Sequence, residues 1–206
     1  MKITTLLLIL LGLSLGLFSS LPEAEADASK PLYCDDPTAI DLARSTEQDQ
    51  KIEKADLIVV SKDRHKLYLL SQGKVINEYA VSFGSGFKGG AKVKEGDGRT
   101  PEGIYTIQFK NAHSKYHLSL LLSYPEKKDI LRAKRLGVNP GSSIMIHGLP
   151  GDFIDNLVPS VIQSIHTLVD WTQGCIAVTD HEIEEIFSLV QEQTTVQICP
   201  LSQPRP

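Results

Sequence analysis

The distribution of apolar and polar residues divides the chain into three segments. Residues 3–18 are almost wholly apolar, whereas residues 27–54 are polar and charged. From residue 57 onward, short apolar or alternating runs recur between turns rich in glycine and polar residues. Runs of this length are typical of β-strands in a folded domain. The third segment is therefore expected to hold the core.

The pattern in this third segment predicts many strands and few helices. Strands are predicted at residues 57–60, 66–70, 75–83, 103–109, 117–124, 144–146 and 195–198, and helices at 126–136, 155–168 and from Thr179 to about 191. Thr179 and Glu182 have the spacing of a capping box, which marks a helix start. Because strands and helices do not alternate regularly, we expect an α+β, β-rich domain with a sandwich-like sheet core and a few decorating helices.

The first segment has the features of an export signal. Lys2 precedes the apolar run, and Ala24-Glu25-Ala26 fits a small-residue cleavage site. We predict that residues 1–26 are a signal peptide and that the protein is exported, periplasmic and without membrane contact after cleavage. The alternative is an uncleaved anchor, for which the apolar run is short. Residues 27–54 are predicted to be a poorly packed lead-in, 55–199 one domain and 200–206 a tail.

Composition excludes several classes of partner. The chain has 206 residues and a net charge of −4, without a long basic block, so nucleic acid is not an expected partner. The basic run at 127–135 has helical spacing and is interpreted as a solvated helix face. The histidines show no ligand spacing typical of zinc. We therefore expect no zinc site.

The three cysteines suggest one disulfide and one free thiol. Cys34 and Cys199 flank the patterned segment, whereas Cys175 lies inside it. In an oxidising compartment, pairing Cys34 with Cys199 would join the chain ends and leave Cys175 free. The alternative is that the two terminal cysteines are unpaired thiols.

Cys175 and His147 have the local sequence expected of a nucleophile and its base. Cys175 follows Gly174 at a loop-to-strand junction, and His147 ends an apolar strand before Gly148. A free thiol is mostly protonated at neutral pH, so a histidine is needed to accept its proton and later protonate a leaving amine. The N–H groups of Gly174 and Cys175 are candidate oxyanion donors, and Thr172 is expected to stabilise this turn. The alternative is a buried structural cysteine and an unrelated strand histidine.

These residues resemble the YkuD-type L,D-transpeptidase catalytic domain. That family has His-Gly followed by Ser/Thr-x-Gly-Cys, which matches residues 147–148 and 172–175. Its Thr-Pro-x-Gly motif is similar to residues 100–103, and the resemblance covers residues 55–199. The resemblance implies that the substrates are peptidoglycan stem peptides and that no cofactor is needed.

The resemblance also implies a reaction. Cys175 would attack the carbonyl at the L-centre of diaminopimelate, and His147 would act as base and then as acid. An amine from another stem would form a 3→3 cross-link, and an envelope lipoprotein is a second possible amine source. Many members have an arginine where this chain has Ala177, and the chain more closely resembles a branch that includes a member hydrolysing the lipoprotein–peptidoglycan link, so hydrolysis that releases lipoprotein is an alternative. A non-catalytic wall-binding module that keeps the fold is a further alternative. Arg99 and Trp171 are weaker candidates for substrate contact.

Overall fold

The structure, a computed structural model, describes residues 33–34, 39–44, 54–151, 161 and 166–202. The predicted signal segment and most of the predicted helix at 155–168 lie outside these residues. The strands are β1 (Leu57–Ser61), β2 (Lys66–Ser71), β3 (Lys74–Ala80), β4 (Gly103–Ser114), β5 (His117–Leu122), β6 (Met145–His147), β7 (Ile176–Ala177) and β8 (Thr195–Cys199). The helices are α1 (Ala39–Leu42), η1 (Phe87–Gly89), α2 (Lys127–Arg135), η2 (His166–Leu168) and α5 (Asp180–Leu189).

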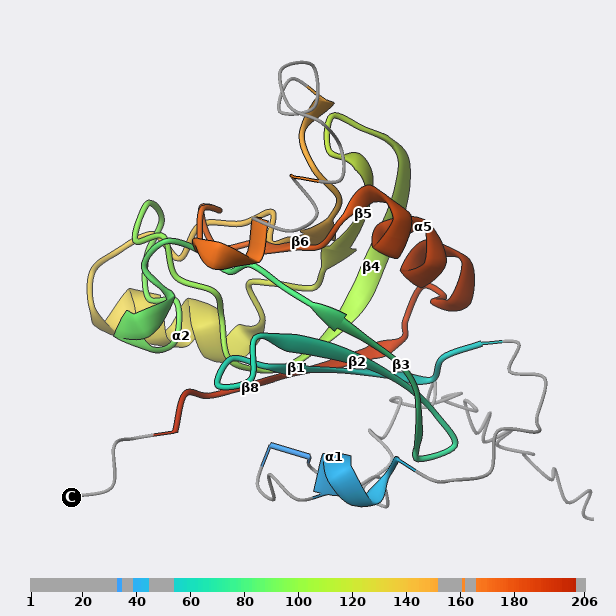
Figure 1. The fold of residues 1–206 in the computed structure, drawn as a ribbon. Helices are drawn as coiled ribbons and strands as arrows, with labels where there is room; N and C mark the ends of the chain where they lie inside the picture. The colour runs from blue at the N-terminus through green and yellow to red at the C-terminus, as the bar shows by residue number, and fades with distance from the viewer. Residues whose placement is uncertain (1–32, 35–38, 45–53, 152–160, 162–165, 203–206) are drawn as a thin grey trace, which may run out of the picture. The chain divides into compact units, whose positions relative to one another are not determined.

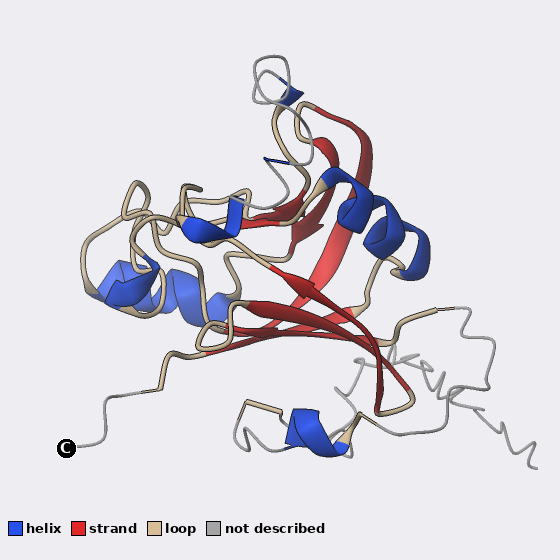
Figure 2. Cartoon of the chain, in the orientation of Figure 1, coloured by secondary structure: helices blue, strands red, loops and turns tan. Residues whose placement is uncertain are grey.

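These strands form a sheet in the order β3-β2-β1-β8-β4-β5-β6-β7. The pairs β1–β8 and β6–β7 are parallel, and the other neighbouring pairs are antiparallel. The long strand β4 pairs with β8 through its first residues and with β5 through its later ones, so it connects two halves of the sheet (Figures 1 and 2). The predicted β-rich fold with few helices is confirmed.

Several predicted strand limits are wrong. The strand predicted at 75–83 ends at Ala80, because Ser82 and Gly84 instead form isolated bridges to Ala177 and Thr172. The strand predicted at 103–109 continues to Ser114 as part of a long antiparallel pair with β5. The strand expected directly after Cys175 is present as β7, but it is only two residues long.

The main core lies between the two halves of the sheet. It contains Ile58 and Leu69 from one half and Leu120, Ile146 and Ile176 from the other. Successive residues of a strand point to opposite faces, yet all of residues 57–60 are buried. A second cluster explains this, because residues 57, 59, 68 and 70 pack on the opposite face against the N-terminal segment. A strand covered on both faces has a continuous apolar run instead of an alternating one.

The expectation of a poorly packed lead-in is wrong for the described part of residues 27–54. Tyr33 and Ile40 are each 4% exposed and belong to the second apolar cluster. The expected disulfide is present between Cys34 and Cys199, and Cys175 is free. The disulfide holds this segment against β8. The segment can therefore bury a few apolar side chains, although most of its residues are polar.

Candidate active site

Strands β6 and β7 bring the candidate histidine and cysteine onto one face of the sheet. In this parallel pair, Ile146 is opposite Ile176 and His147 is opposite Ala177. Cys175 immediately precedes β7, so continuation of this register places it opposite Met145. Cys175 and His147 are then two residues apart along the strands, on the same face, with a Cα separation of about 8 Å. Side chains at that separation can lean towards each other.

The turn before Cys175 is held by Thr172. Its hydroxyl accepts a hydrogen bond from Gly174 N at 3.1 Å and donates one to Cys175 O at 2.7 Å. The predicted role of Thr172 in shaping this turn therefore has a direct structural basis. The Gly174 N–H, which we expected to bind an oxyanion, is engaged by Thr172 instead. Cys175 N–H stays the candidate donor.

Close backbone packing requires glycine beside the thiol. Gly174 has a φ of 123°, and a Cβ there would lie 2.5 Å from Arg99 O. A Cβ on Gly84 would lie 2.1 Å from Gly98 O and 2.7 Å from Gly174 Cα. Three backbone segments therefore meet at the turn that carries Cys175. Any side chain at these positions would displace the turn.

The imidazole of His147 is buried and oriented by its neighbours. The side chain is 2% exposed, and Nδ1 lies 2.6 Å from Gly148 O. Since a carbonyl oxygen can only accept, Nδ1 carries the proton and Nε2 is the unprotonated nitrogen of the neutral ring. Tyr116 stacks on the imidazole at 4.3 Å between ring centroids, and Trp171 approaches edge-on at 5.9 Å. The ring therefore has one defined orientation.

Burial favours the neutral forms of both groups. Burial lowers the pKa of His147, and the hydrogen bond with Gly148 O partly opposes this. Burial raises the pKa of the partly buried Cys175 thiol, which the Met145 N–H and the charge of Lys92 counteract. The thiol donates to Ser143 O at 3.6 Å. Both shifts favour a neutral thiol and a neutral imidazole over a thiolate and an imidazolium.

The glycine-rich loop next to this site is organised around Asp97. Its carboxylate accepts hydrogen bonds from the backbone N–H groups of Val93, Lys94 and Arg99, and from the Lys92 ammonium at 2.9 Å. Burial opposes ionisation of Asp97, but these donors lower its pKa to about 2. Lys92 is itself only 3% exposed. The loop thus places a fixed positive charge near Cys175.

The motif at residues 100–103 anchors the other end of this loop. Thr100 is fully buried, and its hydroxyl accepts from Gly84 N at 3.2 Å. The ammonium of the fully buried Lys62 donates to Thr100 O at 2.8 Å and pairs with Glu102 at 2.7 Å. The motif therefore holds the backbone that packs on Gly174.

The two weaker site candidates differ in their placement. Trp171 borders His147, as a residue lining the site would. Arg99 contributes its carbonyl to the packing on Gly174, whereas its guanidinium lies against Gly89. A direct contact between Arg99 and substrate stays a prediction. Gly148 supports the site through its carbonyl, and it packs closely on Asp180 at the start of α5.

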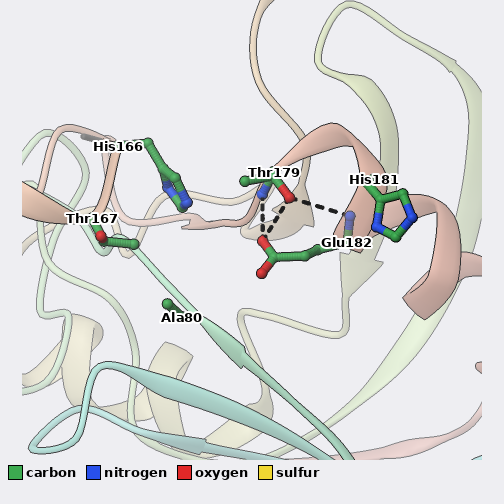
Figure 3. Close-up of a pocket in the computed structure, with 6 residues that line it drawn as sticks. All are labelled: Ala80, His166, Thr167, Thr179, His181 and Glu182. Atoms are coloured by element: carbon green, nitrogen blue, oxygen red, sulfur yellow. Dashed lines mark hydrogen bonds between the residues drawn. The ribbon is translucent and has the colours of Figure 1, made fainter. Parts of the chain in front are cut away.

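A separate hollow of about 450 Å³ lies beyond the other end of β7 (Figure 3). It is lined by Ala80, His166, Thr167, Thr179, His181 and Glu182. The predicted capping box is present here, because Glu182 N donates to Thr179 Oγ1 and Thr179 N donates to the Glu182 carboxylate (Figure 3). Within the described residues, no group of three His, Cys, Asp or Glu side chains is arranged to hold a metal.

Sequence reasoning missed Tyr116, Lys92 and Asp97. Tyr116 lies between β4 and β5, and no local signal connects it with His147. Lys92 is one of several lysines near the glycine-rich loop, and no local signal shows that its ammonium is buried against Asp97. The Asp97-Gly98 turn signal was visible, yet it does not show which groups the carboxylate would bind.

Comparison with known proteins decides the family. The family model of the L,D-transpeptidase catalytic domain matches residues 55–198. The chain belongs to this family. No curated protein sequence matches the chain.

The chain is also similar in fold to several solved structures. A point mutant of the helical cell shape determining protein Pgp2 from Campylobacter jejuni is 25% identical, with a TM-score of 0.50 over 77% of this chain and 53% of that chain. Pgp2 itself is 23% identical, with a TM-score of 0.51 over 79% and 54%. An L,D-transpeptidase from Mycobacterium smegmatis is 13% identical, with a TM-score of 0.45 over 70% and 58%. This L,D-transpeptidase domain chain thus spans about half the length of the Pgp2 structures.

Proposed function

We propose that the protein is an exported cysteine acyl-transferase that acts on peptidoglycan stem peptides in the periplasm. The observation that supports this proposal is the parallel pairing of β6, which ends at His147, with β7, which directly follows Cys175, in a chain that belongs to the L,D-transpeptidase catalytic domain family. The free thiol, the oriented imidazole and the buried cation near the sulfur support the same chemistry.

The acylation step follows from the neutral resting pair. His147 Nε2 accepts the thiol proton as the Cys175 sulfur attacks the carbonyl at the L-centre of diaminopimelate. The charge that develops on the carbonyl oxygen is stabilised by Cys175 N–H. When the tetrahedral intermediate collapses, His147 returns the proton to the leaving amine, and an acyl-thioester remains. The charge of Lys92 favours the transient thiolate and opposes the cost of its burial.

The second half of the reaction decides the product. His147, neutral again, removes a proton from the incoming nucleophile, which attacks the thioester and releases the thiol. An amine from a second stem gives a 3→3 cross-link, and an amine of an envelope lipoprotein gives an anchored lipoprotein. Water gives hydrolysis, including release of lipoprotein from the wall. The small buried side chain of Ala177 stands directly beside His147, where many relatives have an arginine.

Thioester formation tests the nucleophile. We expect residues 27–206 to form a one-to-one covalent adduct with a carbapenem such as imipenem, the compound bound in one solved L,D-transpeptidase structure. Peptide mass spectrometry should locate it on Cys175, and Cys175→Ala should abolish it. The Cys175→Ser variant is a matched control that keeps size and hydrogen bonding but lacks a thiol. Absence of an adduct, or an adduct that persists in Cys175→Ala, would contradict the proposal.

Product analysis separates the possible reactions. The protein would be incubated with purified sacculi and with lipoprotein-linked muropeptides, and the products identified by chromatography and mass spectrometry. New 3→3 cross-links support transpeptidation, whereas released lipoprotein supports the hydrolytic alternative. If wild-type protein and Cys175→Ala give the same products but both bind sacculi, the domain is a wall-binding module.

A further inference from the structure

Helix α2 presents an outward surface that combines cations with large aliphatic side chains. The buried side of the helix is Asp129 and Ala133, which are 2% and 1% exposed. Asp129 accepts from Tyr105 Oη at 3.2 Å and from Arg132 at 3.1 Å, so the rotation of the helix about its axis is fixed. Five residues of the helix point away from this buried side. At 100° per residue, they span an arc of about 140° around the helix axis. The α2 surface consists of these five and the residue that follows the helix: Lys127, Ile130, Leu131, Lys134, Arg135 and Leu136.

The aliphatic members of the α2 surface are unusually exposed for a folded domain. Ile130 and Leu131 are each 49% exposed, and Leu136 is 57% exposed. Leu131, Lys134 and Arg135 line an open hollow of about 640 Å³. Grouped exposed aliphatic residues of this kind mark interaction sites more often than single ones do.

The charges on this surface have one sign. The acidic residue of the described helix, Asp129, is buried, so the helix exposes no acidic side chain. Lys127, Lys134 and Arg135 are all exposed. None of the ion pairs between described residues involves these three cations. The whole chain has a net charge of −4, so this cationic surface is a local departure from an acidic protein.

We propose that the α2 surface binds the surface of a bilayer that contains anionic phospholipid. Aliphatic side chains flanked by Lys and Arg suit the boundary between acyl chains and phosphate headgroups, whereas an anionic polymer would use the cations alone. The hollow also combines an apolar wall with two cations, which suits the binding of a single lipid molecule. No described helix could span a membrane, so the contact would be peripheral and reversible. The proposal differs from our expectations that residues 127–135 are a solvated face and that the exported protein touches no membrane, and vesicle binding decides between them.

Vesicle binding tests this proposal without reference to enzymatic activity. Residues 31–206 form a compact unit, so residues 27–206, without the apolar first segment, are a suitable protein. We expect sedimentation with vesicles of 30% phosphatidylglycerol in phosphatidylcholine, and at least tenfold weaker partition onto pure phosphatidylcholine. Each cation near an anionic surface contributes roughly fivefold to partition, so Lys134→Glu with Arg135→Glu should also lose at least tenfold.

Matched variants distinguish the α2 surface from general charge. Lys74→Glu with Lys88→Glu makes the same change of charge at exposed sites elsewhere and should alter partition less than twofold. Equal losses in both double variants would overturn the proposal, as would equal binding to both kinds of vesicle. Circular dichroism and thermal unfolding would verify that each variant is folded.

A fluorescent reporter tests insertion directly. In a Cys175→Ala background the other two cysteines are in a disulfide, so Leu131→Cys gives one site for an environment-sensitive dye. Its emission should shift to the blue with phosphatidylglycerol vesicles, whereas a dye at Lys74→Cys should not shift. If the emission of the dye at Leu131→Cys does not shift with phosphatidylglycerol vesicles, the proposal is overturned, even if the protein sediments with them. A blue shift produced by an acidic polymer such as polyglutamate would also overturn it.

Discussion

Replacement of Asp97 by asparagine removes the group that organises the loop next to Cys175. The carboxylate is held by three backbone N–H groups and the Lys92 ammonium, and its side chain is 7% exposed. Asparagine has a single acceptor oxygen, so its NH₂ group would face two of these donors. The Lys92 ammonium would stay buried without its partner.

The pKa of Asp97 gives the magnitude. A pKa lowered from 3.8 to about 2 corresponds to about 2.5 kcal/mol of stability, at 1.36 kcal/mol per pKa unit. The unpaired buried cation raises the expected loss for Asp97→Asn towards about 4 kcal/mol at pH 7. Because the folded-state pKa is depressed, this stabilisation is present above pH 3.8 and is lost as the pH falls towards 2. The difference between wild type and variant should therefore shrink over that interval.

Urea unfolding followed by circular dichroism would measure both effects, at pH 7 and in steps from pH 5 to 2.5. Glu184→Gln is the matched control, because Glu184 is 57% exposed and its ion-pair partner among the described residues is the partly exposed His117. It should cost less than about 1 kcal/mol. A loss below 1 kcal/mol for Asp97→Asn, or a loss that does not change between pH 5 and 2.5, would refute this explanation of the loop.

Three further predictions follow from the same structure. Thr172→Val keeps the size of the side chain but removes two hydrogen bonds at the turn. The variant should lose about 1–3 kcal/mol of folding stability and be acylated by a carbapenem at least tenfold more slowly. An unchanged acylation rate in stopped-flow measurements would contradict the role of Thr172. Alkylation of Cys175 by iodoacetamide should keep accelerating above pH 9.0, because burial raises the pKa of the thiol; a rate that levels off below pH 8 would show a stabilised thiolate instead. Reduction of the Cys34–Cys199 disulfide opens a link across 165 residues and should lower stability by about 3–5 kcal/mol; an unchanged unfolding midpoint after verified reduction would show that the link is not stabilising.

Local patterns were sufficient for features whose causes act over a few residues. The capping box of Thr179 and Glu182 was predictable because both partners lie within one helical turn. The free state of Cys175 followed from its position inside the patterned segment, whereas Cys34 and Cys199 flank it. Strand β3 was predicted too long because its apolar pattern continues after the pairing with β2 ends.

The environment of the candidate site depended on contacts that no local pattern encodes. Tyr116 reaches His147 through the pairing of β5 with β6, and the Gly174 N–H is occupied because the turn closes on Thr172. The charge of Lys92 acts on Cys175 only because the glycine-rich loop folds back around Asp97.

By itself, the sequence determined the β-rich character of the domain, the capping box that starts its last helix and the two residue types able to perform acyl transfer. Periodicity and capping are properties of neighbouring residues, so they can be recognised along a single chain. Only the tertiary structure decided that the strand ending at His147 pairs with the strand that follows Cys175, that Thr172 occupies the Gly174 N–H, and that burial favours the neutral forms of both side chains. These depend on strand register and burial, which arise when segments far apart in the chain pack together and exclude water.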